Sequence, residues 1–329
     1  MLSKTRERRK RIIKNTRASR SLAIAAEPDP LSSANAETDE GKLTMAEQEQ
    51  GELFLLDSPL HGPVRGERSL MAWPFFALAK KAWMQPLTYK KGDVSIEVGP
   101  GPKGVATIYD KEILLYIASL MVAKVEAGKH IGQEFSFTAN DLFSVTGANK
   151  SARSYRRLSE ALERLQGTQI KTNIEAGGEG EEGFFSWLQE AKLQYIKGDG
   201  GEKRLKAVKV RLCDWLYRAI MVDRQVLEYA STYFQLGPVE RRLYEVARSL
   251  CVDGQTTIPL EDLRLQMGYQ GSPRQFKFAL TKTIEEDPIP GFQFEIEDQG
   301  LSTLTAAGRT VREYTVKIIP ESTPKRLAS

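Results

Sequence analysis

The sequence predicts an α+β protein in which a disordered N-terminal tail precedes two tandem winged-helix domains. Three observations predict it: a helix-turn-helix pattern that occurs twice, a change to strand periodicity after each copy, and a length of 329 residues. That length suits two domains of roughly 150 residues. The expected segments are a basic tail and acidic linker (1–58), a first domain (59–200), a second domain (201–320) and a C-terminal tail (321–329).

The N-terminal segment is expected to be disordered because it is highly charged and poor in apolar residues. Residues 1–20 hold nine Lys or Arg and one Glu, a net charge of +8, and residues 21–58 hold nine acids and one Lys, a net charge of −8. The whole chain carries +4, so residues 59–329 also carry +4. The basic end can bind phosphates without reading sequence; a solvated tail is the alternative.

Each copy of the helix-turn-helix pattern places an Asp-Leu pair before a glycine and an aromatic residue eight positions after it. The residues are Asp141, Leu142, Gly147 and Tyr155 in the first copy, and Asp262, Leu263, Gly268 and Phe276 in the second. A glycine that adopts positive φ can end the first helix of each pair. An amphipathic helix is expected upstream of each pair, over residues 110–125 and 238–251.

After each helix pair the hydrophobic period falls to two, which predicts a hairpin, or wing. The first wing is expected from residues 168–174 and 184–188, with an acidic loop at 175–183 that should avoid phosphates. The second is expected from residues 292–296 and 311–316. Its loop carries Thr305, Arg309 and Arg312, and can reach a DNA backbone or minor groove, or remain a solvent-exposed hairpin.

The second helix of each pair, over residues 151–165 and 272–284, is the candidate recognition helix. On the second, Arg274 suits guanine, Gln275 suits adenine and Phe278 suits a thymine methyl. The alternatives are a solvated charged face on the first helix and a protein partner that covers Phe278. The expected DNA contacts are Lys150, Arg153, Arg156, Arg157, Arg274, Gln275, Lys277, Phe278, Lys282, Arg309 and Arg312.

Four segments, 106–116, 135–142, 158–165 and 168–170, resemble in order and spacing the plasmid replication initiators of the RepA/TrfA type. The resemblance spans about residues 53–316. It implies tandem winged helices that bind repeated origin sequences called iterons in double-stranded DNA, with Arg153, Arg156, Arg274 and Lys282 as contacts. It also implies a homodimer through the first domain.

Residues 50–54 are similar to the short peptide by which bacterial proteins dock on the replicative sliding clamp. Gln50, Leu53 and Phe54 match that peptide, whereas Gly51 replaces its usual leucine. The alternative is an apolar end of the linker that begins the first domain. If the peptide is functional, the clamp is a partner.

Other chemistry is disfavoured by what the sequence lacks. It has no G-x-x-x-x-G-K-[ST] motif, so a helicase that opens the origin should be a host partner. Two isolated histidines and two cysteines do not suit a nicking site or a structural metal. We therefore expect a cytoplasmic, plasmid-associated bacterial protein that is not an enzyme, with no cofactor, metal or membrane span. A tandem winged-helix transcriptional repressor is the alternative function.

Overall fold

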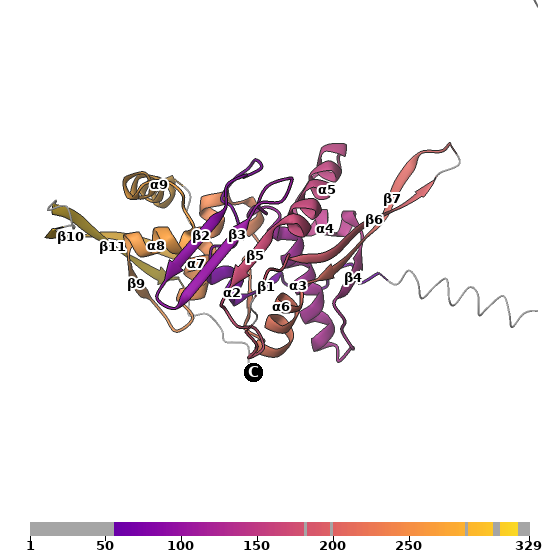
Figure 1. Cartoon of the computed structure of the whole chain (residues 1–329), viewed down its shortest axis with the longest axis horizontal. Coiled ribbons are helices and arrows are strands. Elements are labelled where there is room, and N and C mark those ends of the chain that lie inside the picture. Colours follow the sequence, from indigo (N-terminus) through magenta and orange to yellow (C-terminus); the bar gives the residue numbers. More distant parts are fainter. Residues whose placement is uncertain (1–55, 181–182, 198–199, 287–288, 305–309, 322–329) are drawn as a thin grey trace, which may run out of the picture. The chain divides into compact units, whose positions relative to one another are not determined.

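The computed structural model describes residues 56–180, 183–197, 200–286, 289–304 and 310–321, which form a mixed structure of helices and strands (Figure 1). This content agrees with the expected α+β class. Four short elements come first: β1 (Arg65–Glu67), α2 (Arg68–Ala72), β2 (Leu87–Lys91) and β3 (Val94–Gly99).

Apart from one short strand, β5 (Gln169–Thr172), which follows the third helix, the next part of the chain runs helix, strand, helix, helix, strand, strand, and we call it the first repeat. Its elements are α3 (Lys111–Glu126), β4 (Glu134–Phe137), α4 (Ala139–Thr146), α5 (Ala152–Gly167), β6 (Leu188–Lys197) and β7 (Lys203–Leu212). β7 lies between β4 and β6 and pairs antiparallel with both. The helix pair α4–α5 is thus followed by the hairpin β6–β7.

The second repeat has the same order of elements. They are α7 (Pro238–Leu250), β9 (Thr256–Pro259), α8 (Leu260–Met267), α9 (Pro273–Glu286), β10 (Phe292–Leu304) and β11 (Thr310–Pro320). β11 lies between β9 and β10 and pairs antiparallel with both. The last strand of each repeat is therefore central in its sheet, so the two repeats share one topology.

Local sequence signals explain where the helix pairs begin and end. Gly147 follows α4 with φ 72° and Gly268 follows α8 with φ 69°, the left-handed region that glycine adopts without a Cβ penalty. Thr138 and Ser151 precede α4 and α5, and each side chain accepts a hydrogen bond from the backbone N–H three residues later. The expected helix-turn-helix positions are confirmed.

The first hairpin lies elsewhere than the strand periodicity predicts. β5 (Gln169–Thr172) pairs with β3 in a separate antiparallel sheet of order β2-β3-β5. Among the described residues, the backbones of the two segments expected as wing arms pair only through an isolated bridge between Ile170 and Phe185. The hairpin that follows the helix pair is β6–β7, and the expected domain boundary after residue 200 falls between its two strands. The prediction was wrong because alternation identifies a strand without identifying its partner.

Short elements connect the two repeats. They are α6 (Asp214–Arg218), a π-helical turn (Ala219–Asp223), β8 (Val226–Glu228), which pairs with β1, and a 3-10 turn (Tyr233–Gln235). Two clusters of buried apolar side chains form the core. One draws on residues 70–220 and the other mainly on residues 229–318.

A buried polar cluster joins α3 of the first repeat to α7 of the second. The Nζ of Lys111 lies 2.7 Å from Oε1 of Glu245, and both side chains are fully buried. The hydroxyls of Tyr229 and Tyr233 donate to the same oxygen at 3.0 and 2.7 Å. Arg242 donates to Glu245 and to two carbonyls at the end of α2. Burial lowers the pKa of Lys111 to about 8, although Glu245 opposes the shift. These partners fix how α3 and α7 pack.

Candidate nucleic-acid interface

The N-terminal half of α5 presents cations to solvent. Arg153, Arg156 and Arg157 are exposed, as is Lys150 just before the helix. The opposite face packs into the core through Leu158, Ala161, Leu162 and Leu165, which are buried as the helical spacing predicts. The expected contact residues of the first repeat therefore share one accessible helix end.

Arg164, on the last turns of α5, binds within the protein. Its Nε and Nη2 each lie 2.7 Å from a carboxylate oxygen of Asp110, which immediately precedes α3. Asp110 is 3% exposed and also accepts a 2.7 Å hydrogen bond from the backbone N–H of Thr107. This bidentate pair holds the C-terminal half of α5 against the start of α3. The N-terminal half remains available to a ligand.

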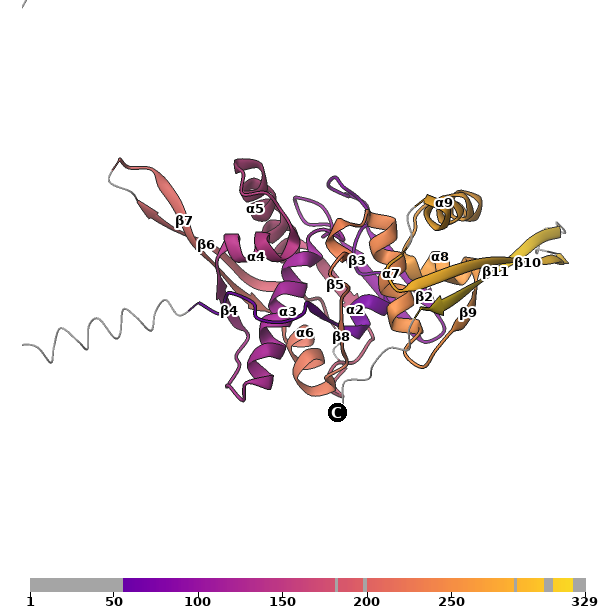
Figure 2. The ribbon, with the colours of Figure 1, turned by 180° about the vertical axis from the view of Figure 1, so that it is seen from behind.

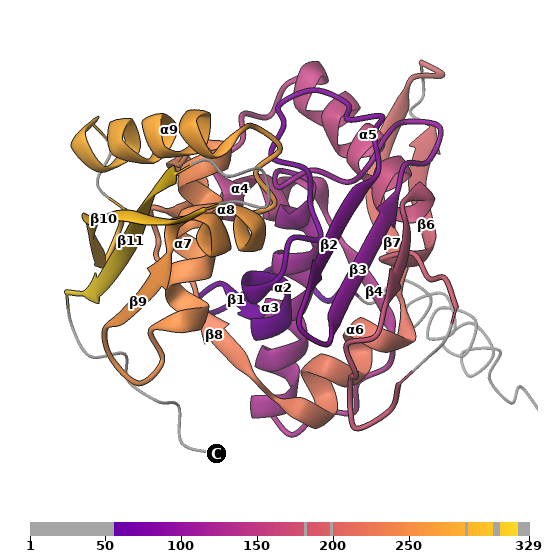
Figure 3. The same ribbon diagram turned by 60° about the vertical axis from the view of Figure 1, so that its left-hand side comes forward.

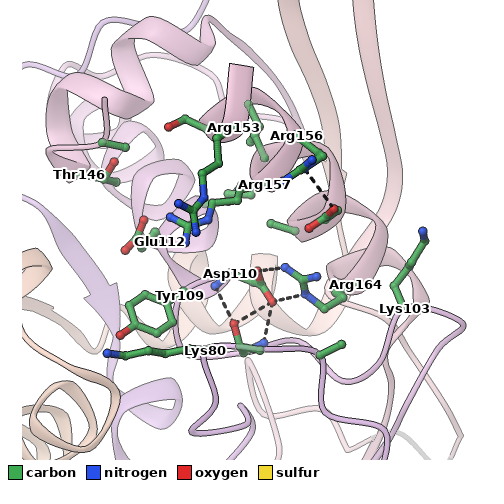
Figure 4. Close-up of a pocket in the computed structure, with 18 of the residues that line it drawn as sticks. Lys80, Lys103, Tyr109, Asp110, Glu112, Thr146, Arg153, Arg156, Arg157 and Arg164 are labelled. Atoms are coloured by element: carbon green, nitrogen blue, oxygen red, sulfur yellow. Dashed lines mark hydrogen bonds and ion pairs between the residues drawn. The ribbon is translucent and has the colours of Figure 1, made fainter. Parts of the chain in front are cut away.

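A groove of about 900 Å³ runs beside α5. Its walls are α5, the start of α3 and two loops that carry Lys80, Lys81 and Lys103. Figure 4 shows Arg153 and Arg157 directed from α5 toward the far wall, where Glu112 lies. The lysines of these loops come from outside both helix pairs, so helical periodicity gave no sign of them.

The groove keeps an excess of positive charge because its acids have arginine partners. The pairs are Asp110 with Arg164, Glu112 with Arg241, and Glu160 with Arg156, with shortest nitrogen–oxygen distances of 2.7, 2.5 and 3.8 Å. Burial raises the pKa of Glu112, and Arg241 opposes that shift. Within the described part of the chain, Arg153 and Arg157 form no ion pair. Their charges, with those of Lys80 and Lys81, give the groove a positive field.

α9 presents its polar side chains on an open helix face. Arg274, Phe278 and Lys282 are exposed, and the Phe278 side chain is 73% exposed. Lys282 lies 3.5 Å from Glu286 one turn later, an exposed pair that contributes little to stability. The inner face is buried through Phe276, Leu280 and Thr283. An exposed Phe on such a face suits contact with a base methyl.

Two expected contacts of α9 are engaged within the protein. The Oε1 of Gln275 accepts a 2.8 Å hydrogen bond from the backbone N–H of Ser272, and the Ser272 hydroxyl accepts one from the N–H of Gln275. This reciprocal pair is a capping box, which the sequence Ser-Pro-Arg-Gln could have revealed. The Nζ of Lys277 lies 3.4 Å from the ring centroid of Tyr314 on β11, a cation–π contact.

The hairpin β6–β7 is a cationic element that the sequence interpretation missed. Residues 188–212 hold seven Lys or Arg and three acids. Lys192 faces Lys209 and Lys197 faces Lys203 directly across the two strands, although like charges in such pairs are unfavourable. Tyr195 is 52% exposed on the same hairpin. This hairpin is therefore suited to a polyanion, unlike the acidic loop that the sequence predicted as the end of the first wing.

α5 and α9 lie on the same side of the described structure in all three views (Figures 1, 2 and 3). The far end of β6–β7 reaches the same side, next to α5. Arg312 on β11 is exposed and pairs with Asp298 at 3.2 Å. Four expected site residues lie outside the described residues: Gln50, Leu53, Phe54 and Arg309.

The described residues contain no group of three His, Cys, Asp or Glu side chains that could hold a metal ion. None of their helices is long and apolar enough to cross a membrane. Both cysteines are buried.

Comparison with known proteins gives matches that cover most of the chain. The family model described as Replication initiator protein A matches residues 65–294. A putative replication protein of Wigglesworthia glossinidia brevipalpis is 29% identical over 252 residues, which cover 73% of this chain and 88% of that protein.

Two solved structures are also similar to this chain. Domains 2 and 3 of RctB, crystallised as selenomethionine derivatives, match with a TM-score of 0.51 and 16% identity over 76% of this chain and 95% of that one. The Pi initiator protein in complex with iteron DNA has a TM-score of 0.43 and 14% identity, over 65% of this chain and 91% of that one.

Proposed function

Because the chain belongs to the replication initiator protein A family, we propose that it starts replication by binding direct repeats, or iterons, in double-stranded origin DNA. In this proposal the two repeats are tandem winged-helix domains, with a boundary beyond Leu212 rather than at residue 200. α5 and α9 are the recognition helices, and β6–β7 and β10–β11 are the wings.

The observation that carries the proposal is that two copies of one topology direct cationic helices to the same side. A recognition helix contacts base edges mainly through its N-terminal residues, and linked units read sites separated by whole turns of the duplex. Both helices have their exposed arginines in this N-terminal part. One chain can therefore contact successive major grooves.

The proposed contacts combine backbone binding with base reading. They are Lys150, Arg153, Arg156, Arg157, Arg274, Lys277, Phe278, Lys282, Arg309 and Arg312. We assign base reading to Arg274 and Phe278, since guanidinium suits guanine and an apolar ring suits a thymine methyl. Gln275 is left out because its amide oxygen caps α9.

We further propose that this initiator is not an enzyme and that host proteins complete the reaction at the origin in the bacterial cytoplasm. The sequence lacks the phosphate-binding motif of an ATP-driven helicase, so a host helicase would open the strands. The peptide containing Gln50, Leu53 and Phe54 would recruit the sliding clamp. The chain would also form a homodimer through the first domain.

Footprinting of the full chain tests the central claim. Hydroxyl-radical protection is expected on one face of a duplex that carries direct repeats, with major-groove contacts about 10 base pairs apart or a multiple of that spacing. Protection of one groove only would contradict the tandem arrangement. The gene supplied in trans should also replicate a plasmid that carries only the repeats and origin; repression of a promoter without replication would favour a transcriptional repressor.

A further inference from the structure

We propose that the groove beside α5 binds the phosphodiester backbone of one DNA strand, with Lys80 and Lys81 as contacts. This inference rests on the proposed function, because it requires α5 to enter a major groove. It adds a binding site made by residues outside both helix-turn-helix pairs. The ligand class is the phosphates of duplex DNA.

The charges of the groove are the first argument. Its three acids have arginine partners, whereas Arg153 and Arg157 have no ion-pair partner among the described residues. These two arginines lie four residues apart on α5, a spacing at which like charges repel each other. Lys80 and Lys81 are exposed on the same groove. Four cations in a groove whose acids already pair with other arginines suit a chain of phosphates.

The position of the groove is the second argument. A helix in the major groove has one DNA strand on each side of it. In Figures 1 and 2, α5 lies between the loops that join α2, β2, β3 and α3 on one side and the hairpin β6–β7 on the other. Lysines of the hairpin face one strand, and those of the groove face the other.

Lys103 has a different part in the same groove. Its Nζ lies 3.7 Å from Glu163 on α5, with both side chains about half exposed. A carboxylate next to DNA is repelled by phosphates, and a nearby lysine reduces that repulsion. Lys103 therefore offsets Glu163 at the C-terminal end of the groove, while Lys80 and Lys81 contact phosphates. Figure 4 shows Lys80 and Lys103 at opposite ends of the groove.

The test uses the double variant Lys80→Ala/Lys81→Ala of the full chain. The probes are a labelled duplex that the wild-type chain has selected from a random library and a random duplex of equal length. The loss of two phosphate contacts should reduce the magnitude of the slope of log K against log salt by about 2. It should weaken binding to both duplexes by the same factor. Lys129→Ala, an exposed lysine after the far end of α3, is the matched control and should change neither quantity.

Phosphate ethylation interference then locates the contacts. Ethylation of phosphates on one strand beside the α5 half-site should inhibit the wild-type chain and should no longer inhibit the double variant. The inference would be overturned if the double variant kept the wild-type salt slope and the wild-type ethylation interference. In that outcome the wild-type chain would still prefer the selected duplex over the random one, so the proposed function would stand. Loss of that preference in the wild-type chain itself would instead contradict the proposed function.

Discussion

α5 and α9 occupy equivalent places in the two repeats but differ in where their acids lie. α5 carries Glu160 and Glu163 in its second half, and each pairs with a cation, one on α5 itself and one across the groove. α9 has no acid before Glu285. The first helix lies beside a cationic groove and a cationic hairpin, whereas the second offers Arg274 and Phe278 on an open face. In the proposed complex, one topology would therefore support backbone binding in one copy and base reading in the other.

The largest expected effect comes from disrupting the buried polar cluster that packs α3 of the first repeat against α7 of the second. Lys111→Met should lower the free energy of unfolding by about 3–5 kcal/mol, because it leaves Glu245 charged and buried without its lysine. Urea denaturation measures this loss. The double variant Lys111→Met/Glu245→Gln should lose more, because Arg242, which also pairs with Glu245, then lies buried without that carboxylate. A double variant more stable than the single one would contradict this account.

Arg274→Ala and Arg153→Ala test the division of tasks directly. We expect Arg274→Ala to cost about 1–3 kcal/mol on the selected duplex and to relax specificity at one base pair. Arg153→Ala should weaken binding to the selected and random duplexes equally and reduce the magnitude of the salt slope by about 1. Both quantities come from anisotropy titrations at several salt concentrations. If the two variants exchange these behaviours, the assignment of tasks is reversed.

A further pair of variants distinguishes the proposed first wing, β6–β7, from the acidic loop that the sequence predicted at its end. Lys197→Ala/Lys203→Ala should lower the salt slope by up to about 2 and leave the preferred sequence unchanged, because the opposed lysines can contact only the backbone. Glu175→Gln in the acidic loop is the control and should leave the slope unchanged. If Glu175→Gln changed the salt slope and the lysine double variant did not, the acidic loop and not β6–β7 would lie against the DNA.

The smallest effect concerns the start of α9. Gln275→Ala should lower the free energy of unfolding by about 0.5–1 kcal/mol through loss of the capping box. The selected sequence should not change, because bidentate recognition of adenine needs the amide oxygen that already binds Ser272. Thermal unfolding and a repeat of the library selection measure the two outcomes. A relaxed preference for one adenine would show that Gln275 reads a base.

Local signals in the sequence account for much of the fold. The glycines after α4 and α8, the caps of α4 and α5 and the buried face of α5 follow from spacing and residue type. The second wing also lies where alternation predicts it. The first wing was misplaced because β5 pairs with β3, more than 70 residues earlier in the chain. The run Gly198-Asp-Gly-Gly201 between two alternating segments was the available signal for the true hairpin turn.

The candidate site was predictable only in part. The cations of α5 and α9 follow from helical periodicity, and the structure leaves Arg153, Arg156, Arg157 and Arg274 exposed. Lys80 and Lys81 could not be identified in this way, because a loop joins a site only through tertiary packing. Arg164 has the same residue type as the candidate contacts, and only the position of Asp110 shows that it binds internally.

The lysines on β6 also affect how copies of this chain meet. β6 lies at the open edge of its sheet, where backbone N–H and C=O groups can accept a further strand from another molecule. Lys192 and Lys197 lie along that edge, and an irregularity in the ladder at Gln194 and Tyr195 distorts it. Charge and distortion both discourage strand addition. Many copies of this chain can thus come close together without their hairpins stacking into aggregates.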